Sequence, residues 1–159
     1  IRKGEPILVD IVHVHRGYIT DMTRMFSIGS PDKIWIERLE QMEEIARKLK
    51  EMLNRGENCS KAWEIGRSMA ENMGHGEHLM GMSPEQSRFL GHSIGLELDE
   101  TPVIAAGFDV PLHEGGTMAI EPKVIFPDGA VGIEDCWVKS SSGMECLSSG
   151  EAFPSWTEW

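Results

Sequence analysis

The sequence predicts an α+β fold in which an antiparallel sheet packs against helices. Two segments have the alternating apolar pattern and central turn of a β-hairpin, and two have the three- and four-residue spacing of an amphipathic helix. Apolar residues make up 40% of the 159 residues, which is enough to build a core. We expect one domain over residues 1–150, followed by a C-terminal tail over residues 151–159.

The first predicted hairpin covers IRKGEPILVDIVHVHRGYITDMTRMFSIG. Alternating apolar residues indicate its strands, and His15-Arg16-Gly17 indicates its turn. If His15 and Arg16 are the two turn residues, Asp10 lies directly across from Asp21, with about 4.5–5.5 Å between their Cβ atoms. Carboxylates at this separation repel, so one pKa rises strongly unless a positive charge, typically a divalent cation, lies between them.

Two amphipathic helices are predicted after this hairpin. The first follows residues 30–32 and repeats apolar residues every three or four positions. These apolar residues are Trp35, Leu39, Met42, Ala46, Leu49 and Leu53. The second helix is expected to run from Ser60, as N-cap, to Met73, with Gly74 as its stop. We interpret the Trp and Met residues of both helices as core and not as the lining of a ligand groove.

The second predicted hairpin covers MAIEPKVIFPDGAVGIEDCWVK, in which Pro127-Asp128-Gly129 is a strong turn sequence. A register centred on this turn places Glu121 opposite Glu134, within one residue if a glycine forms a bulge. Either acidic pair alone is typical of a solvated surface. Two such pairs in one chain, together with a glycine-flanked histidine, favour a metal site.

The candidate metal ligands are Asp10, Asp21, His92, Glu121 and Glu134. Oxygen donors with one imidazole suit hard or borderline divalent ions such as Mn, Co, Fe or Zn. Four carboxylates and one histidine could hold two such ions about 3.5–4 Å apart. The sequence therefore predicts two divalent metal ions as cofactors.

Four motifs also resemble a known family. GYITDMTRMFSIG, FLGHSIGLELDETP, AIEPK and GIED follow one another as in the prolidase, aminopeptidase P and methionine aminopeptidase superfamily, over about residues 4–147. The resemblance is strongest to Xaa-Pro dipeptidases. It implies the pita-bread fold, a curved antiparallel sheet covered by helices, here incomplete at its amino end. It also implies a hydrolase of short peptides that works as a homodimer.

The resemblance assigns roles to the candidate ligands. Asp10 is expected to bind one metal, Asp21 and Glu134 to bridge two metals, and His92 with Glu121 to bind the second. Glu121 is also expected to act as the proton shuttle of a metal-activated water.

Three positions depart from the family pattern. Arg88 and Asp99 stand where the peptidases normally have histidines that donate hydrogen bonds to the substrate, and such donors are each worth about 2.7–4 kcal/mol. Arg88 could stabilise the oxyanion or bind a substrate carboxylate, and Asp99 could pair with Arg88 or hold a substrate ammonium. Gly132 stands where an orienting arginine is frequent. We therefore name Glu121, Arg88 and Asp99 as catalytic candidates.

The departures keep a second function class open. It comprises a metal-dependent lyase or other small-molecule enzyme on the same fold, or a metal-binding module without turnover. His75 and His78 lie in a glycine-rich loop, where solvated side chains are the favoured interpretation, although either could replace a missing proton donor.

Composition narrows the partners. The net charge of −11 argues against nucleic acid and against anionic membranes. No apolar run approaches the roughly 20 residues of a membrane span, and no signal peptide is recognisable. Three cysteines without C-x-x-C spacing do not indicate a disulfide framework. We expect a cytoplasmic protein.

Overall fold

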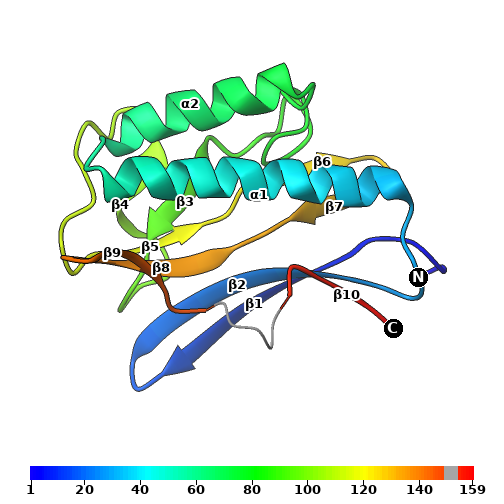
Figure 1. Ribbon diagram of the computed structural model, residues 1–159, viewed down its shortest axis with the longest axis horizontal. Helices are drawn as coiled ribbons and strands as arrows, with labels where there is room; N and C mark the ends of the chain where they lie inside the picture. The colour runs from blue at the N-terminus through cyan, green and yellow to red at the C-terminus, as the bar shows by residue number, and fades with distance from the viewer. Residues whose placement is uncertain (149–153) are drawn as a thin grey trace.

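Two helices and a set of mostly antiparallel strands make up the fold (Figure 1). The computed structural model of the chain describes residues 1–148 and 154–159. In chain order the elements are β1 (Ile7–His15), β2 (Tyr18–Ser27), α1 (Lys33–Asn54), α2 (Cys59–Asn72), β3 (Phe89–Ser93), β4 (Glu100–Ala105), β5 (Thr117–Ile120), β6 (Lys123–Phe126), β7 (Gly129–Gly132), β8 (Asp135–Ser140), β9 (Gly143–Cys146) and β10 (Trp156–Glu158). This order places both helices between the first hairpin and the remaining strands.

The described strands form three sheets. A five-stranded antiparallel sheet has the order β4-β3-β5-β8-β9, β6 pairs with β7, and a third sheet has the order β1-β2-β10. β10 runs parallel to β2 and pairs Trp156 with Met25. The predicted domain boundary at residues 150 and 151 lies outside the described residues. The end of the predicted tail is β10, which adds a strand to the first hairpin.

The first hairpin turns one residue later than expected. Arg16 and Gly17 have φ angles of 53° and 89°, and two positive φ angles are typical of a two-residue type I′ turn. The register consequently pairs Asp10 with Thr23 and Val12 with Asp21, so the prediction that Asp10 lies directly across from Asp21 is wrong. Because the shift between Asp21 and Thr23 is two residues, both aspartates still face the same side as diagonal neighbours.

The second hairpin has the predicted register. Pairing runs from Thr117 opposite Val138 to Phe126 opposite Gly129, in line with Glu121 opposite Glu134. The ladder is interrupted between β5 and β6 and between β7 and β8, where these two glutamates lie. The interruption frees the backbone of both glutamates for bonds to other strands.

The predicted apolar stripe of α1 is buried. Trp35, Leu39, Met42, Leu49 and Leu53 are each at most 6% exposed, and Ala46 packs against the same core. This confirms the interpretation of the stripe as core. Among the described residues, neither helix has the length and apolarity needed to span a membrane.

The start of α2 differs from the prediction, whereas its end agrees. Asn58 is the N-cap, and Ser60 lies inside the first turn, so the prediction of Ser60 as N-cap is wrong. The Ser60 hydroxyl donates instead to the Asp109 carboxylate, and its N–H donates to the Phe108 carbonyl. The helix stops before Gly74, whose φ of 83° continues the chain out of the helix as predicted.

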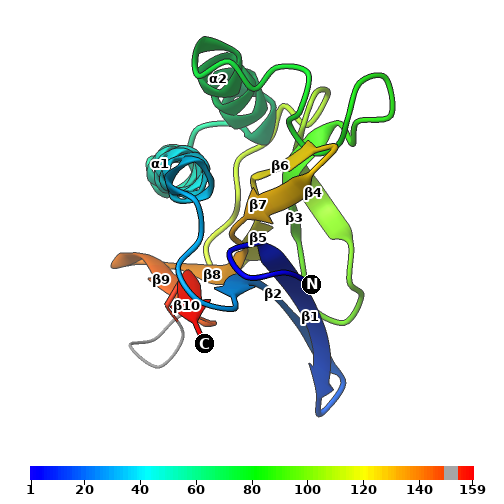
Figure 2. The same ribbon diagram turned by 90° about the vertical axis from the view of Figure 1, so that its right-hand side faces the viewer.

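Both helices pack on one side of the strands, and the β1–β2 hairpin extends on the other side (Figure 2). The core lies between the helices and the five-stranded sheet. Its fully buried side chains include Met42, Ile45, Leu49, Leu53, Leu90, Ile104, Met118, Ile120, Val124 and Val131. The arrangement confirms an α+β fold in which helices cover one face of an antiparallel sheet.

A glycine in α2 sets the distance between the two helices and the sheet. A Cβ atom on Gly66 would lie 2.5 Å from Leu90 Cδ1 and 3.1 Å from Leu49 Cδ2. Both leucine side chains are fully buried. The close approach of α2 to α1 and β3 therefore needs a residue without a side chain at position 66.

We expect Gly66→Ala to lower the free energy of unfolding. Alanine favours a helix over glycine by about 1 kcal/mol, but overpacking a filled core costs about 1–3 kcal/mol. Ser68→Ala, on the exposed side of α2, is the matched control and should stabilise by about 0.5 kcal/mol or less. Urea unfolding followed by circular dichroism measures both, and a stabilised Gly66→Ala would show that the leucines yield without cost.

Candidate metal site

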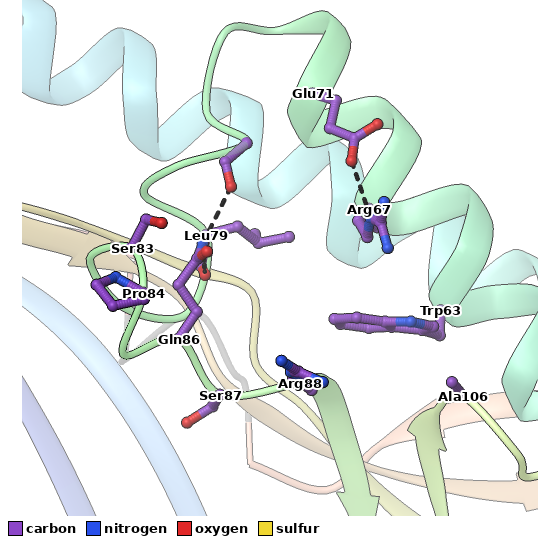
Figure 3. A pocket seen from close by; sticks show the side chains of 11 residues that line it. Trp63, Arg67, Glu71, Leu79, Ser83, Pro84, Gln86, Ser87, Arg88 and Ala106 are labelled. Atoms are coloured by element: carbon purple, nitrogen blue, oxygen red, sulfur yellow. Dashed lines mark hydrogen bonds and ion pairs between the residues drawn. The ribbon is translucent and has the colours of Figure 1, made fainter.

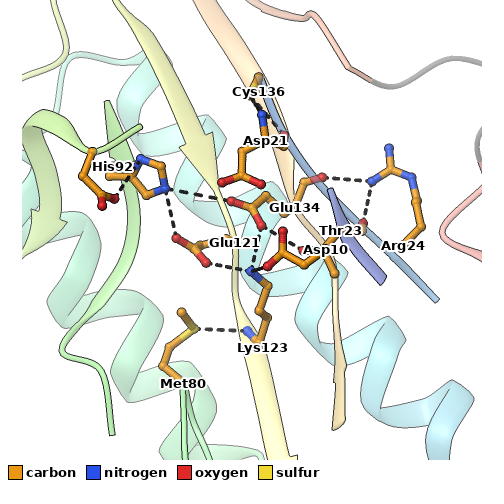
Figure 4. Close-up of polar contacts among 11 residues, drawn as sticks. Asp10, Asp21, Thr23, Arg24, Met80, His92, Glu121, Lys123, Glu134 and Cys136 are labelled. Carbon is orange, nitrogen blue, oxygen red and sulfur yellow. Dashed lines mark hydrogen bonds and ion pairs between the residues drawn. The ribbon is translucent and has the colours of Figure 1, made fainter. Parts of the chain in front are cut away.

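The five predicted ligands converge where the two hairpins meet (Figure 4). Five segments contribute one side chain each: Asp10 from β1, Asp21 from β2, His92 from β3, Glu121 after β5 and Glu134 before β8. Ion-pair and donor-atom distances connect all five in one cluster. The cluster therefore depends on contacts between strands that are far apart in the sequence.

Thr23 joins the first hairpin to the second at this point. Its N–H donates to the Glu134 carbonyl at 3.3 Å, and the Glu134 N–H donates back at 3.4 Å. The Thr23 hydroxyl donates to Glu134 Oε2 at 2.9 Å. This bridge fixes the Glu134 carboxylate relative to β2, which carries Asp21.

Arg24 also connects the two hairpins at this point. Its guanidinium is 4% exposed, and Nη1 donates to the carbonyls of Thr23 and Glu134 at 2.8 and 2.9 Å. Nη2 pairs with Asp135 Oδ1 at 2.6 Å. One planar side chain thus binds the backbone of both hairpins and the carboxylate next to Glu134.

His92 is brought to the cluster by a close approach of β3 and β5. A Cβ atom on Gly91 would lie 2.3 Å from the Ala119 carbonyl oxygen, so this pairing requires a glycine. His92 Nε2 lies 3.3 Å from Glu121 Oε1 and 4.0 Å from Glu134 Oε1. Burial alone would lower the His92 pKa, but the hydrogen bonds with Glu121 and the Ser93 carbonyl, together with the charges of Glu121 and Asp99, outweigh it and raise the pKa to about 9.

Lys123 is the functional residue that the sequence analysis missed. Its Nζ donates to Glu121 Oε2 and Glu134 Oε2 at 2.7 Å each and to Asp10 Oδ2 at 3.2 Å (Figure 4). Burial alone would lower the Lys123 pKa, but the charges of Glu121 and Glu134 outweigh it and raise the pKa. The predicted register contained the signal, because it places a lysine next to the glutamates and opposite Gly132.

The carboxylates are crowded even with this ammonium in place. Burial, followed by the hydrogen bond and charge of Asp10, raises the Asp21 pKa to about 6. Burial, followed by the charge of Glu121, raises the Glu134 pKa to about 7 in spite of Lys123. Burial would also raise the Glu121 pKa, but hydrogen bonds from His92 and Lys123 lower it. The Asp21 side of the cluster therefore carries carboxylates whose charge Lys123 does not fully offset.

A divalent cation fits this side of the cluster. Among the described residues, buried Asp21 Oδ1 and Glu134 Oε1 have no hydrogen-bond partner. Donor atoms of Asp21, His92 and Glu134 all lie within 4.8 Å of one another. Two carboxylates and an imidazole match the donors that zinc, manganese or cobalt accepts. The residues present are therefore suited to hold a metal ion.

Asp99 and Arg88 lie in different places around this cluster. The Asp99 carboxylate is 72% exposed and lies 3.5 Å from His92 Nδ1, on the side of the ring away from the other ligands. Arg88 lines a pocket of about 600 Å³ between α2 and the loop before β3, together with Trp63 and Arg67 (Figure 3). The structure thus brings Asp99 to His92, whereas Arg88 lines a pocket whose lining includes none of the five candidate ligands.

The two loop histidines pack against Phe126. His75 Nε2 lies 2.6 Å from Gln41 Oε1, and His78 Nδ1 lies 2.9 Å from the Ile125 carbonyl oxygen. Their rings lie 5.9 and 4.2 Å from the Phe126 ring. His75 is 7% exposed, which differs from the solvated side chain expected in a loop. These contacts give both imidazoles a packing role.

Comparison with known proteins agrees with the geometry of the site. The sequence profile of metallopeptidase family M24 matches residues 1–139. The Xaa-Pro dipeptidase of Lactobacillus delbrueckii subsp. lactis is 31% identical over 150 residues, which cover 91% of this chain and 38% of the dipeptidase.

Solved structures are similar over the same part of their chains. The X-Pro aminopeptidase from Thermotoga maritima superimposes with a TM-score of 0.87 at 25% identity, covering 100% of this chain and 43% of that one. The prolidase from Pyrococcus horikoshii gives 0.83 at 30% identity, covering 95% and 42%. These matches confirm the pita-bread fold, and the chain spans about two fifths of the length of these relatives.

We expect Arg24→Leu to lower the free energy of unfolding by about 3–5 kcal/mol, because it removes the charged partner of the buried Asp135 carboxylate and one of the donors to the carbonyls of Thr23 and Glu134. Arg24→Leu combined with Asp135→Leu should recover part of this loss. Arg67→Leu removes an exposed arginine paired with Glu71 at i,i+4 and should cost about 0.5 kcal/mol or less. Urea unfolding measures all three, and equal losses for Arg24→Leu and Arg67→Leu would contradict the assigned role of Arg24.

Proposed function

The chain belongs to metallopeptidase family M24, and from this membership we propose that it acts as a metal-dependent hydrolase of the Xaa-Pro dipeptidase or aminopeptidase type. The substrates would be short peptides. The observation that carries the proposal is that donor atoms of Asp21, His92 and Glu134 lie within 4.8 Å of one another, with buried oxygen atoms of Asp21 and Glu134 that have no hydrogen-bond partner among the described residues. Because the chain spans about two fifths of its relatives, the activity of any longer protein that contains it is part of the proposal.

The candidate ligands indicate where a divalent ion would bind. Asp21, His92 and Glu134 would hold a divalent ion, with Glu121 beside His92 as a further ligand. An ion at this place supplies Lewis acidity, which polarises a substrate carbonyl and makes a water molecule more acidic. Five ligands could hold two ions, as the family resemblance implies, or one ion beside the Lys123 ammonium.

Glu121 is suited to accept a proton. Hydrogen bonds from His92 and Lys123 outweigh burial and lower its pKa, so its carboxylate is ionised at neutral pH. A carboxylate within hydrogen-bond reach of the attacking water can take its proton and pass it to the leaving amine. We therefore assign Glu121 as the general base and later the general acid.

Asp99 and Arg88 have supporting roles in the proposal. Asp99 faces His92 Nδ1, so it would orient the imidazole and favour Nε2 as the ligand atom. Arg88 precedes His92 by four residues, which is about 13 Å along an extended strand. That separation favours contact with the far carboxylate of a dipeptide over contact with the oxyanion.

The expectations that the protein forms a homodimer and that it is cytoplasmic stay predictions.

A second candidate function is a non-peptidase on the same scaffold. Arg88 and Asp99 in place of two histidines favour it, as does the ammonium of Lys123 among the ligands. Such a protein would be a lyase or another small-molecule enzyme, or a binding module without turnover. Metal binding without cleavage of any Xaa-Pro dipeptide, by the chain and by any longer protein containing it, would favour this candidate.

We expect Mn²⁺-loaded protein to release proline from Xaa-Pro dipeptides, and Glu121→Gln to lower kcat about 10²–10⁴-fold, because the general base is lost. Glu64→Gln is the matched control, since the Glu64 side chain is 66% exposed on α2 and pairs with the surface lysine Lys61. Proline release is measured with the chain and with any longer protein that contains it. Unchanged turnover in Glu121→Gln would remove Glu121 from the mechanism.

We expect Arg88→Met to lower kcat/KM for an Xaa-Pro dipeptide about 10²-fold, mainly through KM, because a charge-assisted contact to the substrate carboxylate is lost. The same variant should act normally on the corresponding Xaa-Pro amide, which lacks that carboxylate. Arg55→Met, at the exposed end of α1, is the control and should match the wild type on both substrates. An equal loss on dipeptide and amide would instead favour stabilisation of the oxyanion by Arg88.

A further inference from the structure

The Lys123 ammonium lies among the carboxylates of the candidate ligands, where a metal ion would otherwise bind. From this geometry we infer that it replaces one of the two metal ions that the family resemblance implies. The centre then holds one divalent ion per chain, at the side formed by Asp21, His92 and Glu134. The inference rests on the proposed metal-dependent function and specifies the composition of that same site.

The hydrogen bonds of Lys123 match those of a built-in cation. An ammonium has three N–H donors, and three carboxylates of the cluster accept from Nζ, namely Glu121, Glu134 and Asp10. The side chain is 12% exposed, so water cannot readily replace these acceptors. All three donors are therefore directed at predicted metal ligands.

A metal ion cannot share this position with the ammonium. An ion bound by Asp10 and by Glu134 Oε2 would lie about 2.0–2.2 Å from the carboxylate oxygens. The Lys123 nitrogen lies 2.7 Å from Glu134 Oε2 and 3.2 Å from Asp10 Oδ2. An ion and the ammonium on the same two oxygens would compete for the same lone pairs and would repel as like charges.

The glycine opposite Lys123 leaves space for the lysine side chain to extend toward the carboxylates. Lys123 pairs with Gly132 across β6 and β7, and a Cβ atom on Gly132 would lie 2.4 Å from Lys123 Cγ. Lys123 Nζ in turn lies 2.7 Å from Glu134 Oε2. The space of the missing side chain at position 132 is therefore filled by the stem of Lys123 on its way to Glu134.

Met80 forms hydrogen bonds with both the N–H and the carbonyl of Lys123. The Met80 N–H donates to the Lys123 carbonyl at 2.8 Å, and the Lys123 N–H donates to Met80 Sδ at 3.3 Å. These bonds come from the loop that precedes β3. Lys123 is thus anchored at its backbone, along its stem and at its ammonium.

The second position remains open to a divalent ion. Lys123 binds Glu134 through Oε2, whereas Glu134 Oε1 and Asp21 Oδ1 are buried without a partner among the described residues. His92 Nε2 faces the same place and lies 3.3 Å from Glu121 Oε1. Glu134 would accordingly bridge the ammonium and one ion, where the family resemblance implies a bridge between two ions.

Counting bound metal tests the inference without any assay of activity. The protein is dialysed against excess Mn²⁺ and then against metal-free buffer, and Mn per chain is measured by elemental analysis. We expect one ion per chain in the wild type and two in Lys123→Ala, which removes the ammonium and empties its space. Lys48→Ala, a surface lysine on α1, is the matched control and should keep one ion.

Electron paramagnetic resonance of the same samples gives an independent reading. An isolated Mn²⁺ should give the spectrum of a single ion in the wild type, and two ions about 3.5–4 Å apart should give a coupled spectrum in Lys123→Ala. The wild-type result stands even if Lys123→Ala does not fold, which circular dichroism reveals.

Two ions in the wild type would overturn the inference, and proline release by that sample would leave the proposed hydrolase standing. One ion in both the wild type and Lys123→Ala would overturn it as well. No ion in any sample would contradict both the inference and the proposed function.

Discussion

Repulsion among four carboxylates is the constraint on which the rest of the structure depends. Asp10, Asp21, Glu121 and Glu134 meet in one cluster, and the last of these is only 1% exposed. Water screens the charges of the buried Glu121 and Glu134 poorly, so positive groups of the protein or bound ions must balance them. Lys123 provides one such charge, and the raised pKa values of Asp21 and Glu134 locate the side where another is needed.

The fold brings these charges together by interrupting its own hydrogen-bond ladder. The breaks after β5 and before β8 turn the backbone of Glu121 toward Leu90 and that of Glu134 toward Thr23. Glu121 thereby links the second hairpin to β3, and Glu134 links it to β2 in the first sheet. Arg24 stabilises the join through backbone carbonyls, which leaves the ligand carboxylates free for cations. The interruptions would be a defect in an ordinary hairpin, but here they create the site.

The five candidate ligands could be singled out from the sequence because each lies in a local motif with its own periodicity or turn, and the structure brings them together. The register of the second hairpin could be predicted as well, since Pro127-Asp128-Gly129 defines its centre.

The position of the first turn could not be predicted, because Arg16 adopts a positive φ that sequence rules assign to glycine or asparagine. Ser60 was misassigned as a cap because tertiary contacts with Asp109 and Phe108 decide its hydrogen bonds. The role of Lys123 depends on burial and on three partners, which no local pattern contains.

Gly132 and Lys123 give one physical account of what looks like an isolated departure in the sequence. The absence of an arginine at position 132 suggests a weakened site when it is considered alone. Across the β6–β7 pair, however, a side chain at position 132 would collide with the Cβ and Cγ atoms of Lys123, so the lysine stem requires a glycine opposite it. The positive charge is still present, but it comes from the facing strand and ends among the ligands themselves. The departure is therefore better explained as a rebuilt centre than as the loss of one.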